Sequence, residues 1–162
     1  MRIFEELRDC PLLKGLDEGE LSLLGETFVP RRMIEGTTVF IENMPGESLY
    51  LIQQGAVQIS RMSPDGEERT LLILGPENVF GELAVIAPGL RPVTARIVEA
   101  ASLLNLTRKD FDQLCERHPR LGMKLMRNIV RVFSERVRAA EEDFHEMLRF
   151  VLGKSPHHAG GQ

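Results

Sequence analysis

Apolar and polar positions follow three different patterns along the chain, and each pattern predicts a different kind of secondary structure. Residues 11–28 carry apolar side chains at helical spacing, and Asp17 with Glu20 three positions later is a capping-box signature for a short amphipathic helix. Residues 29–106 carry short apolar runs broken by turn residues, and residues 107–152 return to the helical period. The pattern predicts a helix, a β body and a helical C-terminal part.

The middle part is typical of an antiparallel β structure. Glycine, proline, asparagine and acidic residues interrupt it about every dozen positions, and no long helical pattern intervenes. Turn signals at that spacing favour a sandwich or jelly-roll barrel over a parallel sheet. The predicted fold class is mainly β with flanking helices (α+β). The runs that predict strands are TTVFIE, SLYLIQQG, AVQISRM, RTLLILG and VTARIVEA, at residues 37–42, 48–55, 56–62, 69–75 and 93–100.

Two helices are expected after the β body. Thr107 can cap a first helix that ends at His118, because the residue before Pro119 avoids helical geometry. A second, long helix then continues without proline as far as Gly153. The segment that follows, residues 153–162, has the composition of a disordered tail.

The long helix contains a second, 3.5-residue apolar period. Such a repeat is typical of a helix that packs against a copy of itself, and at a rise of about 1.5 Å per residue the helix outruns a domain of this size after Ala140. The sequence therefore predicts a parallel homodimer, with the alternative that Leu125, Ile129 and Val132 let the first turns pack on the chain's own β body. The predicted dimer seam consists of Met126, Val130, Phe133, Val137, Ala140, Phe144, Met147 and Val151.

Composition limits the classes of function. The 162 residues carry a formal net charge of -4, which argues against unspecific binding to nucleic acid. No apolar run reaches the roughly 20 residues of a membrane helix, and the N-terminus is acidic where a secretory signal is basic, so a cytoplasmic protein without a membrane partner is expected. Cys10 and Cys115 are too few for a disulfide framework and are expected to be reduced structural thiols.

The histidines argue against an enzyme. A metal-dependent jelly-roll enzyme needs several histidines on inward strands. The four histidines of this chain, His118, His145, His157 and His158, all lie outside the predicted strands. No catalytic residue, metal site or other cofactor is therefore expected.

One short stretch, VFGELAVIAPGLRPVTA at residues 79–95, combines an acid, an arginine and a tight turn. Gly81 permits a close backbone approach, and the turn that follows it can offer free N–H groups to an anion. Arg91 supplies a two-pronged donor for a phosphate, and Glu82 beside it is explained if it accepts hydrogen bonds from sugar hydroxyls. The stretch therefore fits a nucleotide phosphate and its sugar. The alternative is a Glu82–Arg91 ion pair that only ties a loop across the sheet.

The same stretch resembles the phosphate-binding cassette of the cyclic nucleotide-binding domain family. That cassette is F-G-E-L/M-A, a variable segment and R-S/T/A-A, and here it matches as FGELA at residues 80–84 followed by Arg91. The resemblance covers residues 10–150, through PLLKGLDEGELSLL, EGTTVFIENMPGESLYLIQQGAVQIS and LGPENVFGELAVI. The layout is most similar to the effector domain of catabolite activator protein and other Crp-Fnr-type regulators. It implies a double-stranded β-helix or jelly roll of eight strands with an N-terminal helix and a long C-terminal dimerisation helix.

The resemblance also implies a role for individual residues. Glu82 would bind the ribose 2′-hydroxyl, Arg91 would neutralise the cyclic phosphate, and the base would be covered by the C-terminal helix, where the polar candidates are Arg131, Ser134 and Arg136. The amides of two residues would complete the phosphate cradle and two apolar residues would form walls. The implied ligand-binding set is Gly81, Glu82, Leu83, Ala84, Arg91, Pro92, Val93, Thr94, Ile59 and Leu72.

Pro92 departs from the family pattern. Proline has no N–H and no hydroxyl, so a phosphate oxygen that receives a donor there in the family would lose it. Val93, the next residue, is larger than the usual alanine, and Thr94 is the nearest side chain that could donate instead. An unmet buried bond of this kind costs about 1–3 kcal/mol, which is roughly tenfold to a hundredfold in affinity.

Two functions follow from these observations. The first is a regulatory domain, residues 1–152, that senses cAMP or cGMP and signals through its C-terminal helix to an unknown effector protein. The alternative is a cassette domain that binds no cyclic mononucleotide and serves as a dimerisation or protein-interaction module, or binds another ligand. Direct DNA binding is not expected, because only GKSPHHAGGQ follows the last helix.

Overall fold

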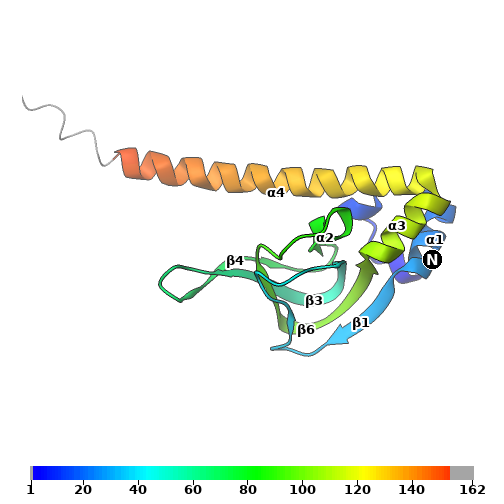
Figure 1. Cartoon of the computed structure of the whole chain (residues 1–162), viewed down its shortest axis with the longest axis horizontal. Coiled ribbons are helices and arrows are strands. Elements are labelled where there is room, and N and C mark those ends of the chain that lie inside the picture. The colour runs from blue at the N-terminus through cyan, green and yellow to red at the C-terminus, as the bar shows by residue number, and fades with distance from the viewer. Residues whose placement is uncertain (1, 154–162) are drawn as a thin grey trace, which may run out of the picture.

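The computed structural model describes residues 2–153, with side chains for residues 3–142 and for His145. A curved sheet forms the body of the molecule, and the long helix α4 (Pro119–Gly153) runs above it (Figure 1). The helices α1 (Glu18–Thr27) and α3 (Arg108–Arg117) lie together at the end of the body where α4 begins. The shorter helix α2 (Leu83–Ile86) lies between the sheet and α4.

The N-terminal helix is shorter than predicted. The structure has two 3-10 turns, η1 (Arg2–Phe4) and η2 (Pro11–Leu13), and α1 begins only at Glu18. Gly15, which has a φ of +78°, separates η2 from α1, because a left-handed residue cannot continue a right-handed helix. The predicted capping box is confirmed: Asp17 accepts from the amide of Glu20 at 2.8 Å, and Glu20 accepts from the amide of Asp17 at 3.1 Å.

The described residues form one antiparallel sheet, so the predicted fold class is confirmed. Its central order is β1-β6-β3-β4, with β2 paired to β6 and β5 paired to β3. The β2 strand is three residues long where six were predicted, and β1 and β5 are strands that the sequence pattern did not indicate. The strands are β1 (Val29–Met33), β2 (Thr38–Phe40), β3 (Ser48–Met62), β4 (Glu68–Leu74), β5 (Val79–Phe80) and β6 (Thr94–Thr107).

Two long strands replace several of the expected short ones. Residues 48–55 and 56–62 belong to the single strand β3, and β6 runs on well past the predicted end at residue 100. Within residues 2–153 the sheet therefore has six strands where eight were implied. The register between β3 and β6 shifts near Gly55, which has a φ of +89°, and a Cβ there would lie 2.4 Å from the carbonyl oxygen of Ala100. These irregularities bend the pair of strands without ending them.

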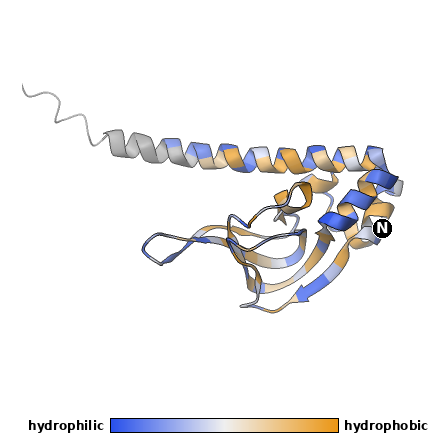
Figure 2. Cartoon of the chain, in the orientation of Figure 1, coloured by the Kyte–Doolittle hydropathy of each residue, from blue (hydrophilic) through white to orange (hydrophobic). Residues whose placement is uncertain are grey.

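The first half of α4 is anchored to the body. Its underside packs into the core, and Asn128 donates from Nδ2 to the carbonyl oxygens of Leu12 and Lys14 at 2.8 and 2.9 Å. Lys124 Nζ contacts Glu20 Oε1 at 2.5 Å. Figure 2 shows apolar and polar bands alternating along α4. The core-facing residues of α4 are Leu121, Leu125, Ile129 and Val132.

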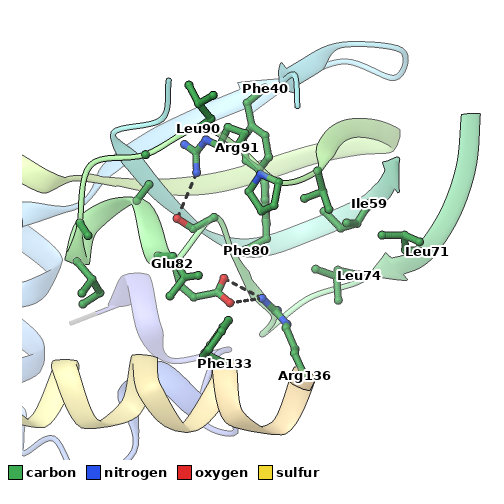
Figure 3. Close-up of a pocket in the computed structure, with 18 of the residues that line it drawn as sticks. Phe40, Ile59, Leu71, Leu74, Phe80, Glu82, Leu90, Arg91, Phe133 and Arg136 are labelled. Carbon is green, nitrogen blue, oxygen red and sulfur yellow. Dashed lines mark hydrogen bonds and ion pairs between the residues drawn. The ribbon is translucent and has the colours of Figure 1, made fainter. Parts of the chain in front are cut away.

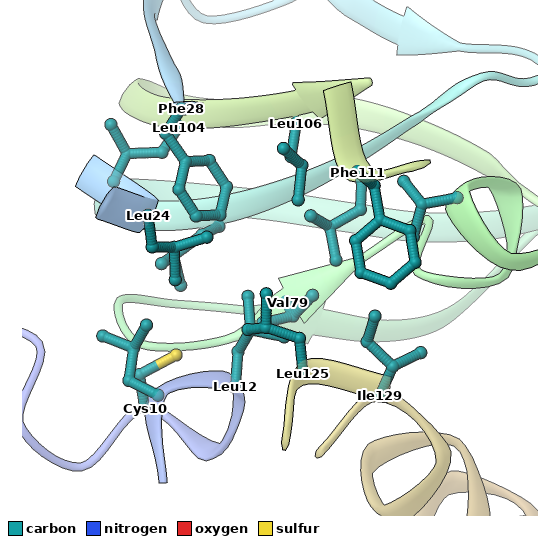
Figure 4. Close-up of a cluster of buried hydrophobic side chains, with 14 of the residues drawn as sticks. Cys10, Leu12, Leu24, Phe28, Val79, Leu104, Leu106, Phe111, Leu125 and Ile129 are labelled. Atoms are coloured by element: carbon teal, nitrogen blue, oxygen red, sulfur yellow. The ribbon is translucent and has the colours of Figure 1, made fainter. Parts of the chain in front are cut away.

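The apolar interior divides into two clusters. The larger joins α1, α3, α4 and one end of the sheet, and Figure 4 shows Cys10 among the side chains that fill it. Burial raises the pKa of the Cys10 thiol to about 11, and it also raises the pKa of Cys115, so both thiols stay protonated at neutral pH. The smaller cluster lies inside the sheet around Phe80, Ile97 and Leu103.

Candidate functional site

A cavity of about 600 Å³ opens between the sheet, α2 and α4. Nearly all of the lining is apolar, and Figure 3 shows Phe133 and Arg136 reaching it from α4. The lining includes nine of the ten residues that the sequence analysis assigned to ligand binding: Ile59, Leu72, Gly81, Glu82, Leu83, Ala84, Arg91, Pro92 and Val93.

The turn before α2 brings the two charged cassette residues to the same cavity. Gly81 has a φ of +70°, and a Cβ there would lie 2.7 Å from Nη1 of Arg91, so both the backbone conformation and the space require glycine. Glu82 stands at the start of α2. The amide of Ala84, one of the two predicted cradle donors, already donates to the carbonyl oxygen of Gly81 at 3.2 Å.

Arg91 is a buried cation that has no acidic partner among the residues that the structure describes. Only 6% of the residue is exposed, and its Nη2 and Nη1 donate to the carbonyl oxygens of Ser48 and Gly81 at 2.8 and 3.3 Å. Its Nε is buried with no hydrogen-bond partner among the described residues, and no described carboxylate forms a salt bridge with it. Burial lowers the pKa of this guanidinium, and the neighbouring Tyr50 and Glu82 oppose that shift. A buried cation of this kind is suited to an anion.

An aromatic ring and a glycine hold Arg91 in place. Its guanidinium carbon lies 4.0 Å from the centre of the Phe40 ring, a cation–π contact. The rings of Phe40, Tyr50 and Phe80 contact one another, and Tyr50 stacks on Phe80 at 5.2 Å. On the other side, a Cβ at Gly46 would lie 2.2 Å from Arg91 Nε. The aromatic cluster therefore holds in position a charge that forms no ion pair within residues 2–153 as described.

Glu82 pairs with α4 and not with Arg91. Both of its carboxylate oxygens accept from Nη1 of Arg136 at 2.8 Å, and Nη2 of Arg136 donates to the carbonyl oxygen of Val79. The Glu82–Arg91 ion pair that the sequence left open as an alternative is therefore wrong. Glu82 is buried, and this contact joins the cassette to α4 (Figure 3).

Thr94 does not line the cavity, which corrects the sequence prediction. Its hydroxyl accepts from the amide of Glu42 at 3.1 Å and donates to the Glu42 carboxylate at 3.4 Å. Thr94 is the first residue of β6 and lines a separate pocket beside Glu42, whereas Val93, just before the strand, lines the cavity. The threonine therefore does not supply the donor that Pro92 lacks.

One known protein family matches the sequence over most of the β body and the helix that follows it. The family described as "Cyclic nucleotide-binding domain" matches residues 30–118, which is more than half of the 162 residues. The chain belongs to the cyclic nucleotide-binding domain family. The resemblance inferred from the cassette is thereby confirmed.

Several bacterial and parasite proteins resemble this cyclic nucleotide-binding domain. The "Cyclic AMP receptor protein" of Thermus thermophilus is 33% identical over 144 residues, which cover 89% of this chain and 64% of the relative. The crystal structure of Thermus thermophilus catabolite activator protein superposes with a TM-score of 0.75 at 33% identity over 85% of this chain and 62% of that one. The regulatory domain of Toxoplasma gondii PKA, solved with cAMP, gives 0.59 at 35% identity over 66% of this chain and 41% of that one.

The chain spans less than two thirds of the length of two curated bacterial regulators that it matches, 62% and 64%. Over the described residues, no helix is both long and apolar enough to cross a bilayer. The same part of the chain brings no three histidine, cysteine or acidic side chains together in a group that could hold a metal ion.

Of the three polar α4 residues considered from sequence, only Arg136 lines the cavity of the cyclic nucleotide-binding domain. Arg131 donates to the side chain of Asn128 at 3.2 Å, and Ser134 is not among the lining residues. Phe40 was not predicted from sequence, because its contact with Arg91 crosses 51 positions and leaves no local signal. Strand alternation or the cassette could have indicated some of the other cavity residues that were not predicted, which are Leu71, Leu74, Phe80, Ile86 and Leu90.

The predicted dimer seam forms an exposed apolar stripe on the described part of α4. Met126, Val130, Phe133 and Val137 are 36%, 53%, 39% and 38% exposed, and Ala140 is exposed as well. The side chains of Phe144, Met147 and Val151, the remaining seam positions, lie outside the described residues.

Proposed function

We propose that this domain binds a cyclic mononucleotide, cAMP or cGMP, in the cavity and passes its binding state to an effector protein through α4. The observation that carries the proposal is Arg91, a buried guanidinium that forms no ion pair with any described carboxylate and lies beside a cavity of about 600 Å³. A single phosphate group would give that cation the counter-charge that the described residues do not supply.

The charge of the cavity supports a ligand with one negative charge. Its lining contains three ionisable residues, Glu82, Arg91 and Arg136, and their formal charges sum to one positive unit. The phosphodiester of a cyclic nucleotide carries one negative unit. Electroneutrality in a largely apolar cavity therefore favours a cyclic phosphate over a phosphomonoester, which brings more charge.

Glu82 is suited to the sugar. An ionised carboxylate has about four lone-pair sites, and Arg136 Nη1 uses one on each oxygen, so sites remain for a ribose hydroxyl. Arg136 then neutralises the carboxylate while the hydroxyl donates to it. Glu82 and Arg91 would therefore hold the two polar ends of a ribose cyclic phosphate.

The contacts of α4 support a route for the signal. Its first half is anchored by Lys124 and Asn128, whereas Phe133 and Arg136, which line the cavity, lie beyond that anchored part. A ligand that forms a hydrogen bond with Glu82 would change the contact that Glu82 makes with Arg136 in the ligand-free domain. A ligand that binds one position of α4 more tightly than another shifts the equilibrium between these positions. The exposed apolar stripe of α4 supports a parallel homodimer as the assembly that carries this change.

Calorimetric titration with cAMP and with cGMP tests the proposal, after a check that no nucleotide is bound to the purified protein. Micromolar or tighter binding of either nucleotide, with a raised unfolding temperature, is expected. The control ligand is 5′-AMP, which has the same base and sugar but a doubly charged phosphate. No heat at millimolar cyclic nucleotide would contradict the proposal and favour the interaction-module alternative.

Replacing Pro92 by serine is expected to tighten cyclic nucleotide binding by about tenfold, because serine restores an N–H and a hydroxyl at the cavity wall. Titration of the wild type and the Pro92→Ser variant measures the effect. Pro92→Ala serves as the matched control, since it restores the N–H alone. Equal affinities for all three proteins would show that this position gives the phosphate no donor.

Replacing Arg136 by glutamine is expected to weaken cyclic nucleotide binding by about tenfold or more. The change leaves the buried Glu82 carboxylate without a cation beside an incoming phosphate. Arg138→Gln is the control, because Arg138 is an exposed α4 residue that does not line the cavity. Unchanged affinity in Arg136→Gln would show that the ligand does not depend on this neutralisation.

A further inference from the structure

We infer that the cavity binds a second class of ligand, a medium-chain aliphatic monocarboxylate such as octanoate, which competes with the cyclic nucleotide for Arg91. Such a ligand has neither a base nor a sugar, so its binding is a property beyond the proposed function. The reason lies in which polar groups of the cavity are already paired within the chain.

Arg91 is the charged cavity residue that no described carboxylate neutralises. A guanidinium has five N–H groups, and the carbonyl oxygens of Ser48 and Gly81 accept from two of those of Arg91. Three N–H groups therefore remain, which is enough for the two oxygens of a carboxylate. A monocarboxylate also supplies the single negative charge that balances the cavity.

The other two charged residues of the cavity are paired with each other. Both carboxylate oxygens of Glu82 accept from Nη1 of Arg136 at 2.8 Å, and Nη2 of Arg136 donates to the carbonyl oxygen of Val79. A ribose has to share Glu82 with this contact, whereas a monocarboxylate on Arg91 leaves the contact as it stands. The monocarboxylate therefore requires less rearrangement of the described side chains.

The backbone beside Arg91 favours an anion with few oxygens. The amide of Ala84 already donates to the carbonyl oxygen of Gly81 at 3.2 Å, and Pro92 has no N–H. A cyclic phosphate brings four oxygens to these surroundings and a carboxylate brings two. Since a buried acceptor without a donor costs affinity, the carboxylate leaves less to satisfy.

The rest of the cavity fits an alkyl chain. Among the described lining residues, the side chains other than those of Glu82, Arg91 and Arg136 carry no hydrogen-bonding group. Figure 3 shows Ile59, Leu71 and Leu74 grouped on the right of the view, away from Arg91. Walls of this kind remove an alkyl chain from water, which gives about fourfold in affinity for each buried CH₂.

A monocarboxylate acts on α4 in the opposite sense to a nucleotide, and this step rests on the proposed function. It fills the cavity without a hydrogen bond to Glu82, so the contact between Glu82 and Arg136 persists. A ligand stabilises the arrangement that it binds more tightly. The carboxylate is therefore an antagonist that holds α4 in the position described here.

Calorimetric titration of the full chain with hexanoate, octanoate and decanoate, all below their micelle-forming concentrations, tests the inference. Affinity is expected to rise about tenfold or more with each added pair of CH₂ groups. Each carboxylate is also expected to raise the apparent dissociation constant of cAMP in a competition titration. The control ligand is 1-octanol, which has the chain length of octanoate but no charge, and it is expected to bind at least about tenfold more weakly than octanoate.

Two variants separate the ligand classes. Arg91→Met is expected to lose both octanoate and cAMP. Replacing Glu82 and Arg136 together by glutamine keeps the net charge of the cavity and removes the ribose partner. This double variant is expected to weaken cAMP by about tenfold or more and to bind octanoate within about threefold of the wild type. Its unfolding temperature checks that it is folded.

A wild type that binds cAMP but none of the three carboxylates would overturn the inference and leave the proposed function standing. Carboxylate binding without binding of either cyclic nucleotide would do the reverse. Octanoate that binds equally well to the wild type and to Arg91→Met, or no better than 1-octanol, would also overturn the inference, because it would show unspecific uptake of the alkyl chain.

Discussion

Arg91→Met is expected to abolish cyclic nucleotide binding while the protein stays folded. Truncating one partner of a buried, hydrogen-bonded charge pair costs about 2–5 kcal/mol, which corresponds to roughly thirtyfold to several thousandfold in affinity. The methionine loses the donors to Ser48 and Gly81, but it also removes a buried cation that pairs with no carboxylate in the described part of the chain. These two effects on stability oppose each other. The free energy of unfolding of the ligand-free protein is therefore expected to change far less than the free energy of nucleotide binding.

Two further variants sharpen this result. Arg96→Met removes an arginine of the same sheet that pairs with Glu68 at 3.0 Å and lies outside the cavity, and it is expected to bind as the wild type does. Arg91→Lys keeps the charge but not the two-pronged donor, and an intermediate affinity is expected. Full binding by Arg91→Met would show that the buried cation serves the loop and not a ligand.

Val130→Asp is expected to convert a dimer into a monomer. Val130 is 53% exposed on the apolar stripe of α4, and in a parallel dimer the two aspartates would face each other across the seam. Burying an unpaired carboxylate costs several kcal/mol per ion, which a single-helix seam cannot offset. Sedimentation at tens of micromolar protein measures the change.

Arg138→Asp is the control for the seam variant. It changes the charge of each chain by two units, more than Val130→Asp does, on a different face of the same helix. The control is expected to remain dimeric, which would separate the seam from general charge repulsion. A wild-type protein that sediments as a monomer would contradict the dimer proposal outright.

The sequence by itself determined the features that depend on neighbouring residues. The capping box of Asp17 and Glu20 and the cap of Thr107 are local hydrogen bonds between residues three positions apart, and both are present. The cassette turn at Gly81 is also local, since its left-handed backbone requires glycine.

The tertiary structure decided which charges meet. Glu82 lies nine positions from Arg91 but pairs with Arg136, 54 positions away, because the packing of α4 on the core sets which guanidinium reaches the carboxylate. The position of Arg91 depends in the same way on Phe40, Gly46 and the carbonyl of Ser48, which come from other loops and strands. Ion pairs and cation–π contacts depend on distance in space, and periodicity along a chain carries information only about nearby residues and the face on which they lie.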